Sequence, residues 1–147
     1  MSDTSAIENE YQTVVFRLGD ESYGIEIFRV NEIIRLCQIT PVPRTGMHIR
    51  GLVNLRGKTI PVVDLRRRLN LADAEDADAT QIIVVESDQG NVGIVVDAVT
   101  EVITLTNDQL EDTPALVADN NTDFVRAVAK CDGDLITLLD LDKALAA

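Results

Sequence analysis

The sequence of 147 residues has few aromatic residues, which make up 3% of it, and it has no tryptophan. Hydrophobic residues make up 46%, so we expect cores built from Val, Ile and Leu. One histidine and two cysteines without CxxC spacing fall short of the about four ligands that a zinc site needs. No apolar run approaches the ~18 residues of a membrane span, and the first ten residues do not resemble a signal peptide. These absences predict an aliphatic globular protein without membrane insertion, with two free thiols in a reducing cytoplasm.

The groups that most enzymes need are also missing. No GxSxG, GxGxxG or GxxxxGK[ST] motif occurs, and His48 lies in an expected turn rather than beside a nucleophile. The segment ADAEDADAT carries Asp73, Glu75, Asp76 and Asp78, but it lacks the glycine and the glutamate of a calcium loop. We therefore expect no catalytic residues, no metal and no cofactor. A small enzyme with an unrecognised site stays as an alternative.

Charge is unevenly distributed along the chain. The net charge is −12, but residues 1–71 hold ten Lys/Arg and eight Asp/Glu, whereas residues 72–147 hold three and seventeen. An acidic surface argues against nucleic acid or anionic lipid as a partner. The basic residues near the first half's hairpin would suit an acidic protein partner, although a bipolar surface kept for solubility is an equal alternative.

The stretch IRGLVNLRGKTIPVVDL, residues 49–65, is typical of a β-hairpin with Gly57 at its turn. Asn54 and Arg56 lie two residues apart and therefore point to the same face of the first strand. A long cation beside an amide at the mouth of a turn can bind a partner. By spacing alone, a solvated strand end explains the same pattern.

The hairpin occurs twice. Residues 125–141 align with 49–65 without a gap. Five aligned positions carry identical residues, which in the first copy are Arg50, Gly57, Ile60, Asp64 and Leu65. Residues 23–34 lie over 92–103, and residues 13–18 lie over 82–87. The chain is thus a tandem duplication of a unit of roughly 60 residues, which sets its architecture. Because Asn54 and Arg56 become Lys130 and Asp132 in the second copy, the divergence at this repeated turn favours a functional role.

We expect a flexible tail over 1–10, copy one over about 12–70, an acidic linker over about 72–80, and copy two over about 81–145. Strands are predicted at 11–18, 23–27, 81–87 and 92–96, and hairpins at 49–65 and 124–141. A short helix is predicted over 28–36, with 98–105 matching it, and a Glu32–Arg35 pair on its polar side. Pro41 and Pro43 predict an extended edge segment over 39–43, before a turn at 45–47.

Pro61 suggests an edge or a bulge in the second arm of the first hairpin. Asp64 is expected to cap a helix over 65–69 whose Arg66, Arg67 and Arg68 are mostly solvated. A polar loop over 106–123 and a final helix over 140–146 complete the chain. The many short strands with glycine turns predict a mainly β protein of two small barrels of about five strands each.

The motif NLRG, followed by VVDLR, with YGIEIFRVNEII before it and VGIVVDAVTEVI after it, resembles the CheW family of bacterial chemotaxis coupling proteins. The resemblance covers about 11–145, as one CheW-like domain. It implies two intertwined SH3-like five-stranded β-barrels with short helices. It also implies a non-enzymatic adaptor, cytoplasmic and at receptor arrays on the inner face of the membrane.

The partners that the resemblance implies are the regulatory domain of the histidine kinase CheA and the cytoplasmic tips of methyl-accepting chemoreceptors. Carried over by motif, the receptor-binding residues are Arg56, Asn54, Gly57, Val30 and Glu32. The kinase-binding residues stay unassigned. An adaptor of the same fold for a different sensory kinase system, such as one for surface motility, is the alternative that the sequence leaves open.

Overall fold

The computed structural model describes residues 10–43, 48–69, 71, 77–87, 90–111, 124–131 and 133–145. Most of the expected tail, the expected turn at 45–47, linker residues 72–76 and loop residues 112–123 lie outside this range. The elements in chain order are β1 (Glu10–Leu18), β2 (Glu21–Glu26), η1 (Ile27–Arg29), β3 (Val30–Arg35), β4 (Ile49–Leu55), β5 (Lys58–Asp64), α2 (Leu65–Arg68), β6 (Gln81–Ser87), β7 (Gly90–Val96), β8 (Ala98–Thr106), η2 (Asn107–Gln109), β9 (Leu110–Glu111), β10 (Val125–Cys131), β11 (Asp134–Leu139) and α3 (Leu141–Leu145).

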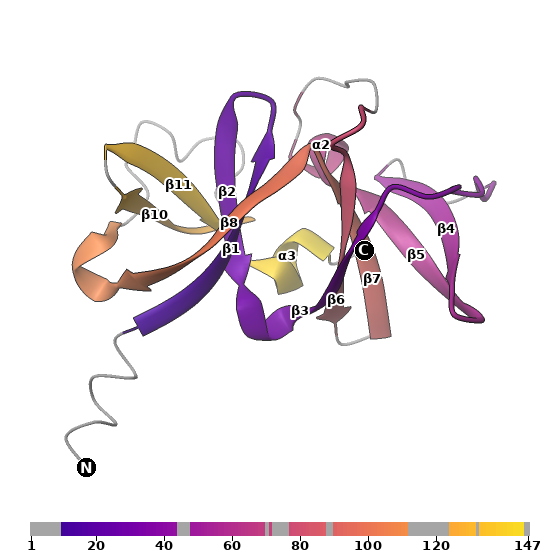
Figure 1. Ribbon diagram of the computed structural model, residues 1–147, viewed down its shortest axis with the longest axis horizontal. Coiled ribbons are helices and arrows are strands. Elements are labelled where there is room, and N and C mark those ends of the chain that lie inside the picture. Colours follow the sequence, from indigo (N-terminus) through magenta and orange to yellow (C-terminus); the bar gives the residue numbers. More distant parts are fainter. Residues whose placement is uncertain are drawn as a thin grey trace, which may run out of the picture.

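Two sheets contain these strands, and each sheet takes strands from both copies. One has the order β8-β1-β2-β11-β10-β9, and the other has β3-β6-β7-β5-β4. Figure 1 shows the first sheet on the left, the second on the right and α3 between them. Apart from β9, the two strand orders match when each strand is replaced by its counterpart in the other copy. The β1–β2 hairpin of copy one lies beside β11 of copy two, and the β6–β7 hairpin of copy two lies beside β5 of copy one. The predicted mainly β fold of two intertwined five-stranded units is confirmed.

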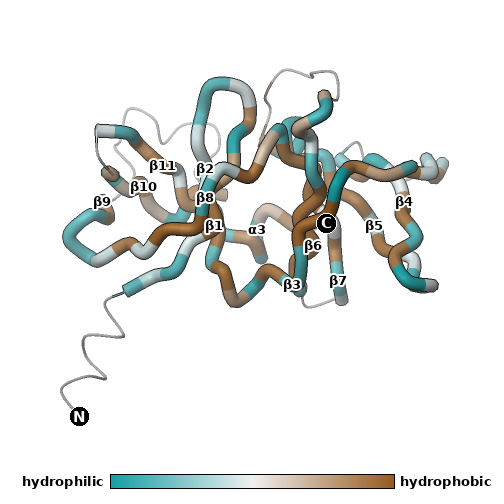
Figure 2. The backbone as a smooth tube through the Cα atoms, in the orientation of Figure 1, coloured by the Kyte–Doolittle hydropathy of each residue, from teal (hydrophilic) through white to brown (hydrophobic). Residues whose placement is uncertain are grey.

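Alternation along the strands divides the core into three parts. Val14 and Phe16 of β1 belong to a large cluster that joins the two sheets, together with Ile83 and Val85 of β6. The residues between them face the other way, and Val15 and Val84 belong to the two smaller clusters. Successive side chains of a strand point to opposite faces. One set therefore fills the space between the sheets, and the other set fills the interior of each curled sheet. Figure 2 shows the resulting hydrophobic strands in the middle of the molecule and the hydrophilic β1–β2 turn.

The helix predicted over 28–36 is wrong. Only Ile27–Arg29 forms a helical turn, and Val30–Arg35 is a strand that pairs with β6. The segment contains several β-branched residues and alternates between exposed and half-buried positions, which suits a strand at the edge of a sheet. The matching segment is β8, which pairs with β1. Pairing with a strand of the other copy therefore overrides the apparent helical spacing.

The expectation for Pro61 is also wrong. Strand β5 has β4 on one side and β7 on the other, so it is not an edge. Pro61 lies opposite Leu52, whose N–H and C=O bond Thr40 on the far side. Pairing with β7 begins only at Val62. The missing N–H of Pro61 therefore removes no bond from either ladder. The two backbone hydrogen bonds between Thr40 and Leu52 agree with the extended backbone expected at Thr40.

The short helices behave partly as predicted. Asp64 caps α2 by accepting a hydrogen bond from the Arg67 N–H at 3.2 Å. The three arginines of α2 differ, because only Arg67 is well exposed. Arg68 donates to the carbonyls of Ala144 and Lys143 and lies 4.8 Å above the ring of Phe124. Arg66 forms an ion pair with Asp97 and is only 16% exposed. The prediction of mostly solvated arginines is thus wrong for two of them, since tertiary contacts cover these two side chains.

Candidate functional site

The candidate site is the turn between β4 and β5 together with the facing part of β3. Arg56 and Gly57 form a two-residue turn in which both have positive φ, at 53° and 83°. This is the pattern of the turns that favour hairpins, and arginine rarely adopts it. The Asn54 side-chain oxygen accepts a hydrogen bond from the Gly57 N–H at 3.0 Å, which holds the turn. Asn54 therefore has a structural role here whatever else it contacts.

Arg56 is held by a carboxylate from another strand. Its Nη1 and Nη2 donate to the two oxygens of Glu32 on β3, at 2.9 and 2.6 Å. A guanidinium paired in this two-point way has a fixed direction as well as a favourable charge. The predicted Glu32–Arg35 pair is thus replaced by Glu32–Arg56, because β3 is a strand and residues three apart do not share a face.

The exposure of the pair differs between its members. The Arg56 side chain is 74% exposed, whereas that of Glu32 is 24% exposed. The hydrogen bonds and the charge of Glu32 raise the pKa of Arg56 above its ordinary value. Arg56 therefore presents a permanent cation to solvent in a defined orientation. Val30, two residues before Glu32, packs partly buried against the large core cluster. The structure thus brings four of the five predicted residues together at the β4–β5 turn and β3, and Val30 lies two residues before Glu32 on β3.

Sequence reasoning missed several exposed apolar residues. Phe28, the first residue of the predicted helix, is 74% exposed in η1. Ile33 and Val102 occupy equivalent positions in the two copies, and both are exposed on β3 and β8. These strands are the outer strands at one end of each sheet. The repeat alignment could have paired Ile33 with Val102, but exposure depended on the strand assignment that the sequence did not give.

His48 and the two cysteines are described residues that lie outside this site. The pKa of His48 is lowered, first by partial burial and then by the charge of Arg68. Cys37 and Cys131 are free thiols, exposed and half-buried respectively. Among the described residues, no group of three or more His, Cys, Asp or Glu side chains could hold a metal ion. No helix in the described part of the chain is long and apolar enough to cross a membrane.

Residues 12–147 match the family model described as the CheW-like domain. The chain belongs to the CheW-like family. "Chemotaxis protein CheW" of Rhizobium meliloti (strain 1021) is 34% identical over 131 residues, which cover 89% of this chain and 84% of the relative. "Chemotaxis protein CheW" of Bacillus subtilis (strain 168) is 32% identical and covers 97% and 91%. The family resemblance found in the sequence is therefore confirmed.

The fold of this CheW-like domain also matches a solved structure. The scaffolding protein TtCheW from Thermoanaerobacter tengcongensis has a TM-score of 0.86 and 37% identity, with 93% of each chain covered. A further relative is "Protein FrzA" of Myxococcus xanthus, which is 31% identical and covers 92% of this chain and 86% of its own length. The family thus includes relatives whose names mention chemotaxis and one whose name does not.

Proposed function

We propose that this protein is a non-enzymatic adaptor that couples the cytoplasmic tips of chemoreceptors to the histidine kinase CheA. Its place is the cytoplasm, at receptor arrays on the inner face of the membrane. Membership of the CheW-like family supports the scaffolding role, since a matched structure is named a scaffolding protein and several relatives are named chemotaxis proteins. The regulatory domain of CheA and methyl-accepting chemoreceptors are the proposed partners, and nucleic acid is not.

The observation that carries the receptor side of the proposal is the Arg56–Glu32 pair. Arg56 is mostly exposed, yet two hydrogen bonds and the turn backbone fix its direction. A side chain ordered before binding loses less conformational entropy when a partner carboxylate replaces or joins Glu32. Receptor tips are helical bundles, so we propose that an acidic group at the edge of a bundle pairs with Arg56. Glu32 then positions Arg56, and Asn54 and Gly57 set the turn.

Val30 is the remaining member of the proposed receptor-binding set. Its half-buried side chain packs against the large core cluster while its backbone begins β3. Its proposed role is apolar contact at the margin of the site. The contacts with the kinase are not assigned to residues.

The test is calorimetric titration of Arg56→Glu against a receptor cytoplasmic fragment and, separately, against the CheA regulatory domain. We expect loss of receptor binding with kinase binding retained, because the reversed charge lies at the receptor-facing turn. Lys58→Glu is the matched control, since it reverses an exposed cation two residues away in the same hairpin. Receptor affinity that is equal in folded Arg56→Glu and wild type contradicts the proposed site. Absence of any binding of the wild type to CheA favours an adaptor for another sensory kinase.

A further inference from the structure

Strand β3 carries a β-bulge immediately before Glu32. Val30 lies opposite Val85 of β6. The next pair is Glu32 with Val84, so Asn31 is an extra residue on β3. Paired residues of neighbouring strands share a face, and an extra residue therefore reverses the face to which the following side chains point. Bulges are common beside functional sites, where they direct a side chain to a new place.

The bulge places the side chains of Val30 and Glu32 on opposite faces of the sheet. Val85, opposite Val30, belongs to the large cluster between the sheets, and Val30 packs against that cluster. Val84, opposite Glu32, belongs to the cluster inside the curled five-stranded sheet. In a regular strand Glu32 would share the face of Val30 and point toward the space between the sheets. The bulge thus directs the Glu32 carboxylate to the face on which it meets Arg56.

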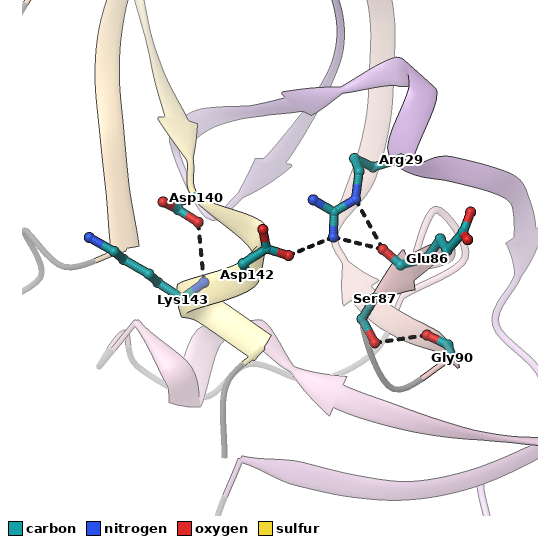
Figure 3. Close-up of polar contacts among 7 residues, drawn as sticks. All are labelled: Arg29, Glu86, Ser87, Gly90, Asp140, Asp142 and Lys143. Atoms are coloured by element: carbon teal, nitrogen blue, oxygen red, sulfur yellow. Dashed lines mark hydrogen bonds and ion pairs between the residues drawn. The ribbon is translucent and has the colours of Figure 1, made fainter.

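The strand pairing on both sides of the bulge is anchored. Before the bulge, Arg29 donates to the Glu86 carbonyl of β6 at 3.0 and 2.8 Å and to Asp142 of α3 at 2.8 Å. Figure 3 shows the Arg29 guanidinium between these two acceptors. After the bulge, Ile34 lies opposite Ile82 and packs against the cluster inside the sheet. These anchors require one extra residue in β3, but they do not decide which residue it is.

The side chain of the bulged residue is held by an asparagine of the second copy. The Asn31 side-chain amide donates to the side-chain oxygen of Asn91 on β7 at 2.7 Å. Asn91 follows the β6–β7 turn, in which the Ser87 hydroxyl donates to the Gly90 carbonyl at 2.8 Å (Figure 3). Both asparagines are exposed, so water competes for their hydrogen bond and its contribution to total stability is small. It nevertheless favours one position of the bulge over its neighbours.

The second copy has the same bulge, but a different contact holds it. The register of β1 with β8 shifts at Thr100, which aligns with Asn31 in the repeat. The Thr100 hydroxyl donates directly to the Val15 carbonyl of β1 at 3.2 Å. The bulge is therefore a feature of the fold that both copies share, whereas the bond to Asn91 belongs to the copy that carries Arg56.

We propose that Asn31 and Asn91 are positioning residues for Arg56. Their hydrogen bond keeps the bulge at residue 31, the bulge turns Glu32 to the interior face, and Glu32 then orients Arg56. If the bulge moved by one residue, Glu32 would itself be the extra residue and would lose its direction toward Arg56. The expected effect on receptor binding rests on the function proposed above, whereas the effect on the Arg56–Glu32 pair does not.

The test follows the Arg56 guanidinium directly by NMR. Two hydrogen bonds to one carboxylate slow the rotation of the guanidinium about its Nε–Cζ bond, and the line shapes of the Nη–H signals report the rate. We expect Asn31→Ala and Asn91→Ala each to raise this rate about two- to tenfold, the change in an equilibrium that one hydrogen bond produces. Glu32→Ala removes the carboxylate and gives the upper limit of the rate. The urea midpoint of both asparagine variants should stay near that of the wild type, because the lost bond is exposed.

The repeat itself supplies a rescue variant and a matched control. In Asn31→Thr the new hydroxyl should donate to the Val84 carbonyl, as the Thr100 hydroxyl does to the equivalent carbonyl of β1. The slow rotation of Arg56 should then be kept, and adding Asn91→Ala should have no further effect. The control is Thr100→Ala, which removes the hydrogen bond of the other bulge and should leave the rotation of Arg56 unchanged.

Receptor titration of the same variants separates this inference from the proposed function. Asn31→Ala should lower receptor affinity by about two- to tenfold and leave binding to the CheA regulatory domain unchanged, because a mobile Arg56 must be ordered on binding. The inference is overturned if neither alanine variant raises the rotation rate, if Thr100→Ala raises it equally, or if Asn31→Thr fails to keep it low. A raised rotation rate with unchanged receptor affinity supports the inference and contradicts the proposed receptor role of Arg56.

Discussion

Arg56 and Glu32 join the two opposite ends of the five-stranded sheet. Glu32 is on β3 at one end of the strand order, and Arg56 is in the turn of the hairpin that supplies the other end. The contact therefore shows that the sheet curls until its ends meet, as in a barrel. A curled sheet leaves fewer unpaired strand edges exposed. The same ion pair both marks this closure and orients the cation proposed to bind receptors.

Arg56→Asn should separate stability from binding. Asparagine adopts positive φ more readily than arginine, and Asn-Gly is the preferred sequence for a two-residue hairpin turn. This gain in turn stability offsets the loss of the exposed ion pair with Glu32. We expect the midpoint of urea unfolding to stay equal or rise while receptor affinity falls in calorimetry. A midpoint clearly below that of the wild type would mean that the ion pair, rather than the turn, holds the hairpin.

Gly24→Ala and Gly93→Ala should each destabilise the fold by about 1–3 kcal/mol, because a methyl group would be forced into a packed core. A Cβ at Gly24 would lie 2.6 Å from Thr13 Cγ2, and one at Gly93 would lie 2.8 Å from Ile82 Cγ2. Urea denaturation measures the loss. The exposed Thr59→Ala in β5 is the control and should change stability by no more than about 0.5 kcal/mol. Glycine variants as stable as this control would contradict the packing.

Phe16→Ala should weaken both sheets together. Phe16 is fully buried in the cluster that contains residues of both sheets, so the free energy of unfolding should fall by about 3–5 kcal/mol. The shared core predicts one cooperative transition in which amides of β1 and of β6 lose protection against hydrogen exchange at the same denaturant concentration. Loss confined to the sheet of β1 would show that the two units unfold independently.

Tyr23 should make stability depend on pH in the alkaline range. Burial, followed by the hydrogen bond to Glu21, raises its pKa above the ordinary value. The folded state therefore keeps a proton that the unfolded state releases near pH 10, so stability is full below about pH 10 and falls above it. Urea midpoints measured from pH 8 to 11 should decline less in Tyr23→Phe than in the wild type. Equal slopes would mean that another group is responsible.

The errors of sequence prediction have a common physical cause. A local pattern predicted a helix over 28–36, but the free energy of pairing with β6 outweighs this pattern in Val30–Arg35. The partner of Glu32 was expected three residues away and lies instead 24 residues away. Arg66 and Arg68 were predicted to be solvated because they lie in a short helix, but residues of the second copy cover both side chains. Each error concerns a contact between segments that are distant in the sequence.

The sequence by itself determined the duplication, the hairpins and the motif that marks the family, because turn residues and strand alternation act over a few neighbouring residues. It also placed Arg56, Asn54 and Gly57 at one turn. Only the tertiary structure decided that β6 and β7 pair with strands of the first copy, and that Glu32 orients Arg56. These are contacts between segments that lie far apart in the sequence, and turn residues and strand alternation over a few neighbouring residues do not specify them.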